Sequence, residues 1–348
     1  MNLSEATTSP SSRPRRGTVS RRAHARGVLI ALVSILFGAV AQVGFAQIAE
    51  KTLHIGILSS GSYELRDSLD EALVQGLRDQ GYIEGRNLTI ERRYSSSKVR
   101  DNAIELAGMK LDAVLTTCTP STRIMKEATS STPIVMAAVS DPVRQGIIAS
   151  LARPGQNVTG TSSQAEDLLA KRVELVARIV PKSTIVAVLA NARNPVHALG
   201  WETLSRAAQE MNLVLLKVEL KSPDDLAEAI GSAARARAGA LFVMPDDPMM
   251  MNLRPQIVEL AQRHRMADFY WAREFVALGG LMSYGESLSG SYRAAAVYMD
   301  KIKKGAHPGS LPVQQPTRFE LVINMKRTQA LGLDIPQTLL VQADEVIR

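Results

Sequence analysis

Residues 53–81, LHIGILSSGSYELRDSLDEALVQGLRDQG, decide the fold of this 348-residue chain. They begin with a short apolar run, 53–58, which is too short for a helix and leads into a loop rich in serine and glycine. The next segment, 66–80, repeats leucine at four-residue spacing and stops at Gly81, as an amphipathic helix does. A short buried strand followed by such a helix is the repeating unit of a parallel α/β sheet.

The same unit recurs along the rest of the chain. Residues 88–94 alternate like a strand near a sheet edge, and the chain starts a second series of units after Pro154-Gly155. Further strands are predicted at 113–117, 134–138, 185–189, 213–218, 239–244 and 267–270. Further helices are predicted at 99–109, 121–130, after Pro142, and at 168–180, 196–211, 224–237, 253–265 and 325–331. Two such series in about 300 residues predict an α/β fold of two doubly wound parallel-sheet lobes.

The first 46 residues have the pattern of an export signal. An arginine-rich segment ends at Arg26, an apolar run follows, and small residues permit cleavage after Ala41 or after Ala46. Residues 27–46 are also long enough to span a bilayer, so an uncleaved anchor is the alternative. We expect the protein in the periplasm, tethered to the membrane only if the leader is retained.

The charge of the chain is concentrated in this leader. The formal charge is +7, but the leader holds six basic residues and one acidic residue, which leaves 35 basic against 33 acidic residues in the body. A nearly neutral body gives no broad attraction to a phosphate backbone, and we expect no nucleic-acid partner.

The sequence also lacks the patterns of common catalytic and metal sites. Cys118 is the single cysteine, so no intrachain disulfide can form. The four histidines of the body are widely separated, and no phosphate-binding loop, dinucleotide-binding glycine pattern or His-Glu-x-x-His motif is present. We therefore expect no enzyme, no metal and no cofactor.

Six phrases of the body resemble those of a known family, in order and at matching spacing. They are ILSSG (57–61), GLRDQGYIEGRN (76–87), SDPV (140–143), RPGQNVTG (153–160), GGLMSYG (279–285) and PVQQPTRFELVIN (312–324). Together they resemble the substrate-binding proteins of ABC transporters, in particular the tryptophan- and tyrosine-binding group.

This resemblance implies a type I periplasmic-binding-protein-like fold, in which two lobes close on a ligand by a hinge. The N-terminal lobe is expected at 51–163 plus about 285–315, and the C-terminal lobe at 164–284 plus about 316–348. Three crossing segments are expected near 161–166, 282–285 and 314–318. The implied function is capture of a small organic solute, such as an amino acid, and its delivery to an ABC permease. We expect the mature protein to be monomeric.

Ligands of open parallel sheets bind beyond the carboxyl ends of the strands, so polar residues there are the site candidates. In the first lobe we predict ligand contact, with turn formation or helix capping as the alternative, for the residues that follow three strands: Ser59, Ser60, Ser62, Thr117, Thr119, Ser121, Thr122, Ser140 and Asp141. The helix start after Cys118 is where a ligand carboxylate is expected, with Thr119 or Ser121 as its N-cap.

In the second lobe the candidates are Asn191, Asn194, Asp246, Asp247, Trp271 and Tyr284. A ligand ammonium needs a carboxylate partner, and Asp246 is the first choice for it, ahead of Asp247. Helix capping is the alternative for both. Trp271 and Tyr284 either contact the ligand or pack in the core.

One alternative function remains within the binding class. A protein that presents its ligand to a membrane receptor or sensor kinase uses the same closed-lobe recognition, and the residues do not separate it from a transport protein.

Overall fold

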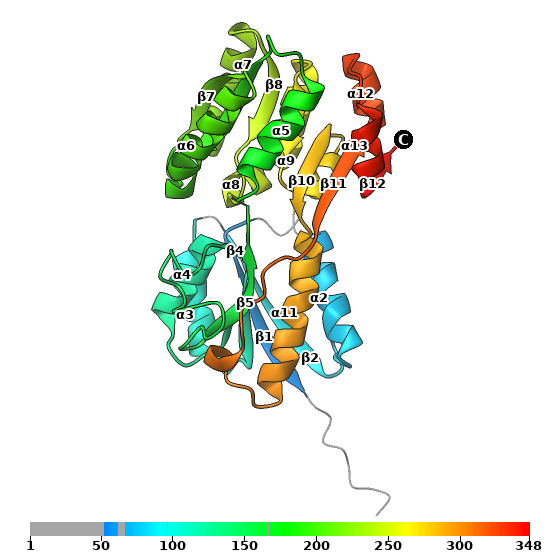
Figure 1. Cartoon of the computed structure of the whole chain (residues 1–348). Helices are drawn as coiled ribbons and strands as arrows, with labels where there is room; N and C mark the ends of the chain where they lie inside the picture. The colour runs from blue at the N-terminus through cyan, green and yellow to red at the C-terminus, as the bar shows by residue number, and fades with distance from the viewer. Residues whose placement is uncertain (1–51, 62–66, 96, 166) are drawn as a thin grey trace, which may run out of the picture. The chain divides into compact units, whose positions relative to one another are not determined.

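Two β-sheets, each covered by helices on both faces, organise residues 52–348 in the computed structural model (Figure 1). The structure describes residues 52–61, 67–95, 97–165 and 167–348. The predicted leader, 1–46, lies outside the described residues.

The first sheet has five parallel strands in the order β2-β1-β3-β4-β5. Its strands are β1 (Leu53–Ser59), β2 (Leu88–Tyr94), β3 (Ala113–Thr116), β4 (Ile134–Ser140) and β5 (Val158–Ser163). Its helices are α2 (Asp67–Asp79), α3 (Val99–Gly108), α4 (Thr119–Ala128) and α11 (Leu288–Lys303). The predicted edge position of 88–94 is confirmed, because β2 pairs with β1 alone.

Successive residues of β1 explain why the sheet needs helices on both faces. Ile55 and Ile57 belong to the core under α2 and α11, whereas Leu58 belongs to the opposite core under α3 and α4. A strand buried on both faces reads as a continuous apolar run, which is the signal at 53–58.

The second sheet has seven strands in the order β12-β11-β10-β9-β8-β6-β7. Its pairs are parallel except for the antiparallel pair of β10 with β11. The strands are β6 (Ile185–Asn191), β7 (Val214–Leu220), β8 (Ala238–Val243), β9 (Ala267–Tyr270), β10 (Met282–Glu286), β11 (Phe319–Asn324) and β12 (Glu345–Ile347).

Helices of the second lobe cover this sheet on both faces. One core lies under α5 (Leu169–Ile179), α6 (Pro195–Glu210), α12 (Met325–Leu331) and α13 (Gln337–Gln342). The other lies under α7 (Leu226–Arg235), α8 (Pro248–Asn252), α9 (Arg254–Arg263) and α10 (Arg273–Ala277). Short 3-10 turns are present at η2 (Pro223–Asp225) and η3 (Pro308–Ser310).

The chain passes between the two sheets three times. It leaves the first sheet after β5, returns from β10 to α11 around Ser287, and crosses again between η3 and β11. Thr161 forms an isolated bridge with Gln314, so the first and third passages run side by side. The two-lobed parallel-sheet fold predicted from the sequence is confirmed.

One predicted helix is wrong. Residues after Pro142 form turns, with hydrogen bonds from the Gln145 N–H to the Asp141 carbonyl and from the Ile147 N–H to the Pro142 carbonyl. Asp141 and Gly146 have φ values of 33° and 68°. These left-handed conformations break the repeat of a right-handed helix at both ends of the segment.

Candidate functional site

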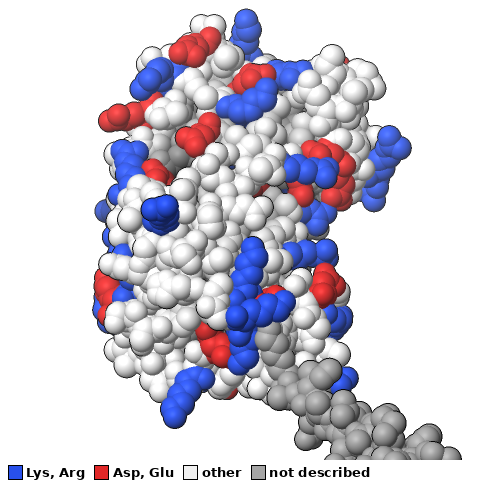
Figure 2. Space-filling model, turned by 60° about the horizontal axis from the view of Figure 1, so that its bottom comes forward, with Lys and Arg blue, Asp and Glu red and all other residues white. Residues whose placement is uncertain are grey.

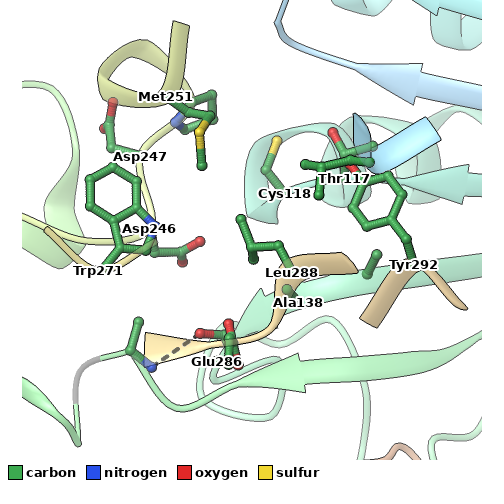
Figure 3. A pocket seen from close by; sticks show the side chains of 15 residues that line it. Thr117, Cys118, Ala138, Asp246, Asp247, Met251, Trp271, Glu286, Leu288 and Tyr292 are labelled. Atoms are coloured by element: carbon green, nitrogen blue, oxygen red, sulfur yellow. Dashed lines mark hydrogen bonds between the residues drawn. The ribbon is translucent and has the colours of Figure 1, made fainter. Parts of the chain in front are cut away.

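A cavity lies where the carboxyl ends of the strands of the two sheets face each other (Figure 3). Its volume is about 40 Å³, which is room for a few water molecules at about 10–15 Å³ each. Residues of both lobes and of the crossing segments line it: Leu69, Thr117, Cys118, Ala137, Ala138, Ser163, Ala165, Asp246, Asp247, Pro248, Met251, Trp271, Glu286, Leu288 and Tyr292. A solute the size of an amino acid can enter only if these side chains or the lobes move apart.

Asp246 and Asp247 follow β8 but point in different directions. The Asp246 carboxylate is directed toward the cavity in Figure 3, whereas that of Asp247 points away from it. Asp246 has a φ of 56°, a left-handed conformation that aspartate tolerates better than most residues. This turn of the backbone separates the two neighbouring carboxylates.

The Asp247 carboxylate holds the loops of the second lobe together. Its Oδ2 accepts hydrogen bonds from the side-chain amides of Asn191 and Asn194, both at 2.9 Å. Its Oδ1 accepts the backbone N–H of Met250 at 3.0 Å and so caps α8. Asp247 therefore lines the cavity with both carboxylate oxygens engaged by protein groups.

His197 connects the same two loops, which follow β6 and β8. Its Nδ1 accepts the backbone N–H of Asn191 at 2.8 Å, and its Nε2 lies 2.9 Å from the carbonyl of Pro245. These contacts require the neutral tautomer with the proton on Nε2. Burial lowers the pKa of His197, against the attraction of the Asp247 charge and the hydrogen bond to Pro245.

In the first lobe, α4 begins at the cavity. Its N-cap is Cys118, in extended conformation and without a side-chain capping bond, so the predicted N-cap at Thr119 or Ser121 is wrong. The hydroxyls of Ser121 and Thr122 instead donate to the carbonyl of Cys118, at 3.1 and 2.9 Å. The Cys118 side chain does not cap the first turn, and the positive end of this ten-residue helix lies beside the cavity.

Most hydroxyls predicted near α4 are occupied within the first lobe. Thr117 lines the cavity and donates to the buried Ser59 Oγ at 3.1 Å. Thr122 pairs with Thr116 at 2.7 Å. Thr119 does not line the cavity, and its Oγ1 is buried without a hydrogen-bond partner among the described residues.

A larger groove of about 780 Å³ lies beside the cavity and shares Asp247 and Pro248 with it. Four of the predicted site residues line this groove: Ser60, Asn191, Asn194 and Asp247. The lobes touch along it, because the Asn252 amide donates to the Ser60 carbonyl at 3.4 Å. Asn194 also caps α6 through the backbone N–H of Val196.

The two predicted aromatic residues have different surroundings. Trp271 lines the cavity and packs on Phe275, with ring centroids 4.8 Å apart. Tyr284 packs against the core of the second lobe and faces Phe319 with centroids 6.2 Å apart. Between Tyr284 and Glu286, Gly285 passes so close to the Trp271 carbonyl that any Cβ would collide with it.

The remaining predicted residues lie away from the cavity or outside the described residues. Ser140 is buried at the end of β4. Asp141 accepts the backbone N–H of Arg144 at 3.1 Å and so stabilises the following turn. Ser62 lies outside the described residues.

The sequence analysis missed Glu286, which ends β10 and lines the cavity. Burial raises its pKa to about 7, against hydrogen bonds from Ser163 and Gln164 and the attraction of Arg172. The sequence signal that could have identified Glu286 is an acidic residue directly after Gly285, next to a segment expected to cross between the lobes. Leu288, Tyr292 and Met251 were missed as well; they lie on α11 and α8, which were not among the predicted helices.

Surface charge on the described residues is mixed. Acidic and basic side chains are interspersed over the face in Figure 2. Within the described ranges no cluster of three His, Cys, Asp or Glu side chains is placed to hold a metal ion. No helix in this part of the chain is both long and apolar enough to cross a membrane.

The family model of the ABC transporter substrate binding proteins matches residues 54–347. A curated relative, the tyrosine-binding protein of Clostridioides difficile strain R20291, is 26% identical over 291 residues, which are 82% of this chain and 82% of that protein.

Two solved structures are similar to this one at 26% identity. An ABC domain from Streptococcus pneumonia in complex with L-Trp has a TM-score of 0.74, with 84% of this chain and 100% of that chain covered. A conserved domain protein from Vibrio cholerae O1 biovar eltor has a TM-score of 0.75, with 85% and 99% covered.

Proposed function

Because this chain belongs to the ABC transporter substrate-binding protein family, we propose that its solute is an amino acid or a close relative, bound in the cavity between the lobes. Membership makes the protein an extracytoplasmic solute-binding component of an ABC importer, which works with a membrane permease and is not an enzyme. The observation that carries the choice of solute is the position of the Asp246 carboxylate, which is directed into the cavity.

The two charged groups of an amino acid match opposite walls of the cavity. The ammonium pairs with Asp246 of the second lobe, because a buried cation without a partner is costly. The carboxylate lies at the start of α4 in the first lobe, where backbone N–H groups and the helix dipole favour an anion. One solute then contacts both lobes, and its binding stabilises the closed arrangement.

Two relatives support this class of solute. One is named a tyrosine-binding protein, and the other was solved with L-Trp. Trp271 and Tyr292 line the cavity and provide aromatic surface for the side chain of such a solute.

The test is calorimetric titration of Asp246→Asn with L-tyrosine and L-tryptophan. Loss of a charged hydrogen bond is worth about 1.5–3 kcal/mol, so we expect affinity to fall by at least about tenfold. Asp141→Asn is the matched control, because Asp141 also follows a strand and has a positive φ, but it does not line the cavity. Unchanged affinity in Asp246→Asn, or an equal loss in the control, would refute the assignment.

We also propose that the protein works as a monomer in the periplasm after its leader is removed. The pattern of residues 1–46 supports export. The intact mass of the protein recovered from the periplasmic and membrane fractions tests both cleavage sites. Recovery in the membrane fraction with a mass that includes residues 1–46 would show that the leader is retained as an anchor.

A further inference from the structure

Glu286 places a carboxyl group with an unused oxygen in the wall of the cavity. Its side chain is partly buried, and its Oε2 has no contact with solvent and no hydrogen-bond partner among the described residues. Ser163 and the backbone of Gln164 act on the carboxyl group and lower its pKa, but not enough to offset its burial. A withdrawn oxygen without a donor is destabilising, and a bound solute can supply that donor.

Arg172 is the protein cation that acts on Glu286, but it is committed elsewhere. Its Nε donates to the carbonyl of Tyr284 and its Nη1 to that of Ala165, both at 2.7 Å. Glu286 forms no ion pair within 4.0 Å in the described part of the chain. Its burial therefore outweighs the attraction of Arg172, and the pKa of Glu286 rises to about 7.

The described part of the cavity lining is acidic. Asp246, Asp247 and Glu286 belong to it, and none of the described lining residues is Lys, Arg or His. The hydrogen bonds of Asp247 occupy both of its oxygens. If Asp246 binds the α-ammonium as proposed above, Glu286 is the carboxyl left to meet the far end of the solute.

We infer that Glu286 is a specificity residue that selects solutes with a second protonated nitrogen, that is, basic amino acids and related organic cations, over neutral ones. This inference rests on the proposed function. A second cationic group supplies both the missing donor for Oε2 and the charge that a buried carboxylate needs. A neutral aromatic side chain supplies neither.

The matched pair of probes is L-arginine and L-citrulline, which have nearly the same shape and differ in the charge of the terminal group. The wild-type protein should bind L-arginine at least about tenfold more tightly, the effect of one charged hydrogen bond. In Glu286→Gln this preference should fall to about twofold or less. Glu274→Gln is the control, because Glu274 also has a buried oxygen without a partner but lies outside the cavity lining, and it should keep the wild-type preference.

The pH dependence gives a second readout that needs no variant to fold. With a pKa of about 7, Glu286 is mostly neutral at pH 6 and mostly ionised at pH 8, so affinity for L-arginine should rise about tenfold between them. Binding at pH 6 should also release close to one proton per solute. Among the described residues, Arg172 is the charged group that acts on Glu286, and Asp246 and Asp247 line the same cavity. Burial leaves the pKa of Arg172 at about 10, so it stays protonated. Glu286→Gln keeps these groups and His197, and its profile should be flat.

The outcomes separate this inference from the proposed function. Equal binding of L-arginine and L-citrulline by the wild type, alongside binding of L-tryptophan or L-tyrosine, overturns the role of Glu286 alone. Preference for L-citrulline, lost in Glu286→Gln, would mean that a protonated Glu286 donates to a neutral solute, and it also overturns the inference. Binding of none of the four amino acids overturns the proposed function and this inference together.

Discussion

Replacing Asp247 with asparagine tests whether this residue shapes the site or binds the solute. The carboxylate accepts three hydrogen bonds, two at Oδ2 from Asn191 and Asn194 and one at Oδ1 from Met250. The residue is 4% exposed, so water replaces these bonds poorly. An asparagine has one acceptor oxygen and can serve only one of the two sets.

The energies decide which set survives. If the amide oxygen faces Asn191 and Asn194, the protein loses the cap of α8, which is worth about 1 kcal/mol. If it faces Met250, two bonds are lost, each worth about 1–2 kcal/mol. The first orientation is favoured, so Asp247→Asn should cost about 1–2 kcal/mol of unfolding free energy. Asp247→Ala loses all three bonds and should cost about 3–5 kcal/mol.

Urea unfolding measures this difference. With a slope of about 3 kcal/mol per molar urea for a protein of this size, the midpoint should fall by roughly 0.3–0.7 M in Asp247→Asn and by at least about 1 M in Asp247→Ala. Solute affinity of Asp247→Asn should stay within about threefold of wild type, because Asp246 is the residue directed into the cavity. Equal stability losses in the two variants would refute the hydrogen-bond argument. A tenfold loss of affinity at unchanged stability would show that the carboxylate of Asp247, and not that of Asp246, binds the solute.

Two further predictions concern buried charge. Burial lowers the pKa of His197 in the folded state below its unfolded value, so protonation of this histidine favours the unfolded state. The free energy of unfolding should therefore fall as pH drops below about 6.5, by at most about 1.4 kcal/mol per pH unit. The raised pKa of Glu286 makes the protein more stable as pH falls between about 7 and 4.5, which opposes the effect of His197. The difference in urea stability between wild type and His197→Gln, measured from pH 5 to 7, isolates the effect of His197. A difference that does not change with pH contradicts the prediction. Arg327 pairs with the fully buried Asp268 at 3.1 Å and donates to the carbonyls of Ala261 and Met266, so Arg327→Met should cost about 3–5 kcal/mol in urea unfolding. If Arg327→Met combined with Asp268→Asn costs the sum of the two single changes, the residues do not interact.

The sequence by itself determined the class of fold. Apolar runs such as 53–58 place residues in the cores on both sides of the sheet, so they must be covered on both faces, and the helices between them carry one apolar stripe each. These are local signals, and β1, α2 and the edge strand β2 follow from them. The helix predicted after Pro142 was wrong because Asp141 and Gly146, on either side of this segment, have left-handed backbone conformations. Turn geometry sets these conformations, and residue type does not specify them uniquely.

The loops of the site were also accessible from the sequence, since ligand-facing loops follow strand ends. The direction of each side chain was not. Asp246 and Asp247 are chemically alike, and only the left-handed backbone of Asp246 sends one carboxylate toward the cavity and the other to Asn191 and Asn194. That those residues contact a solute stays a prediction.

Tertiary structure alone brought Glu286 to the site. It lies about 40 residues after Asp246 in the chain, on a strand of the second sheet, and it reaches the cavity because β10 leads directly into α11 of the first lobe. Its unused oxygen and raised pKa arise from burial among Ser163, Arg172 and the opposite lobe. Such desolvation depends on every segment that packs around a group, and no local pattern of residues encodes it.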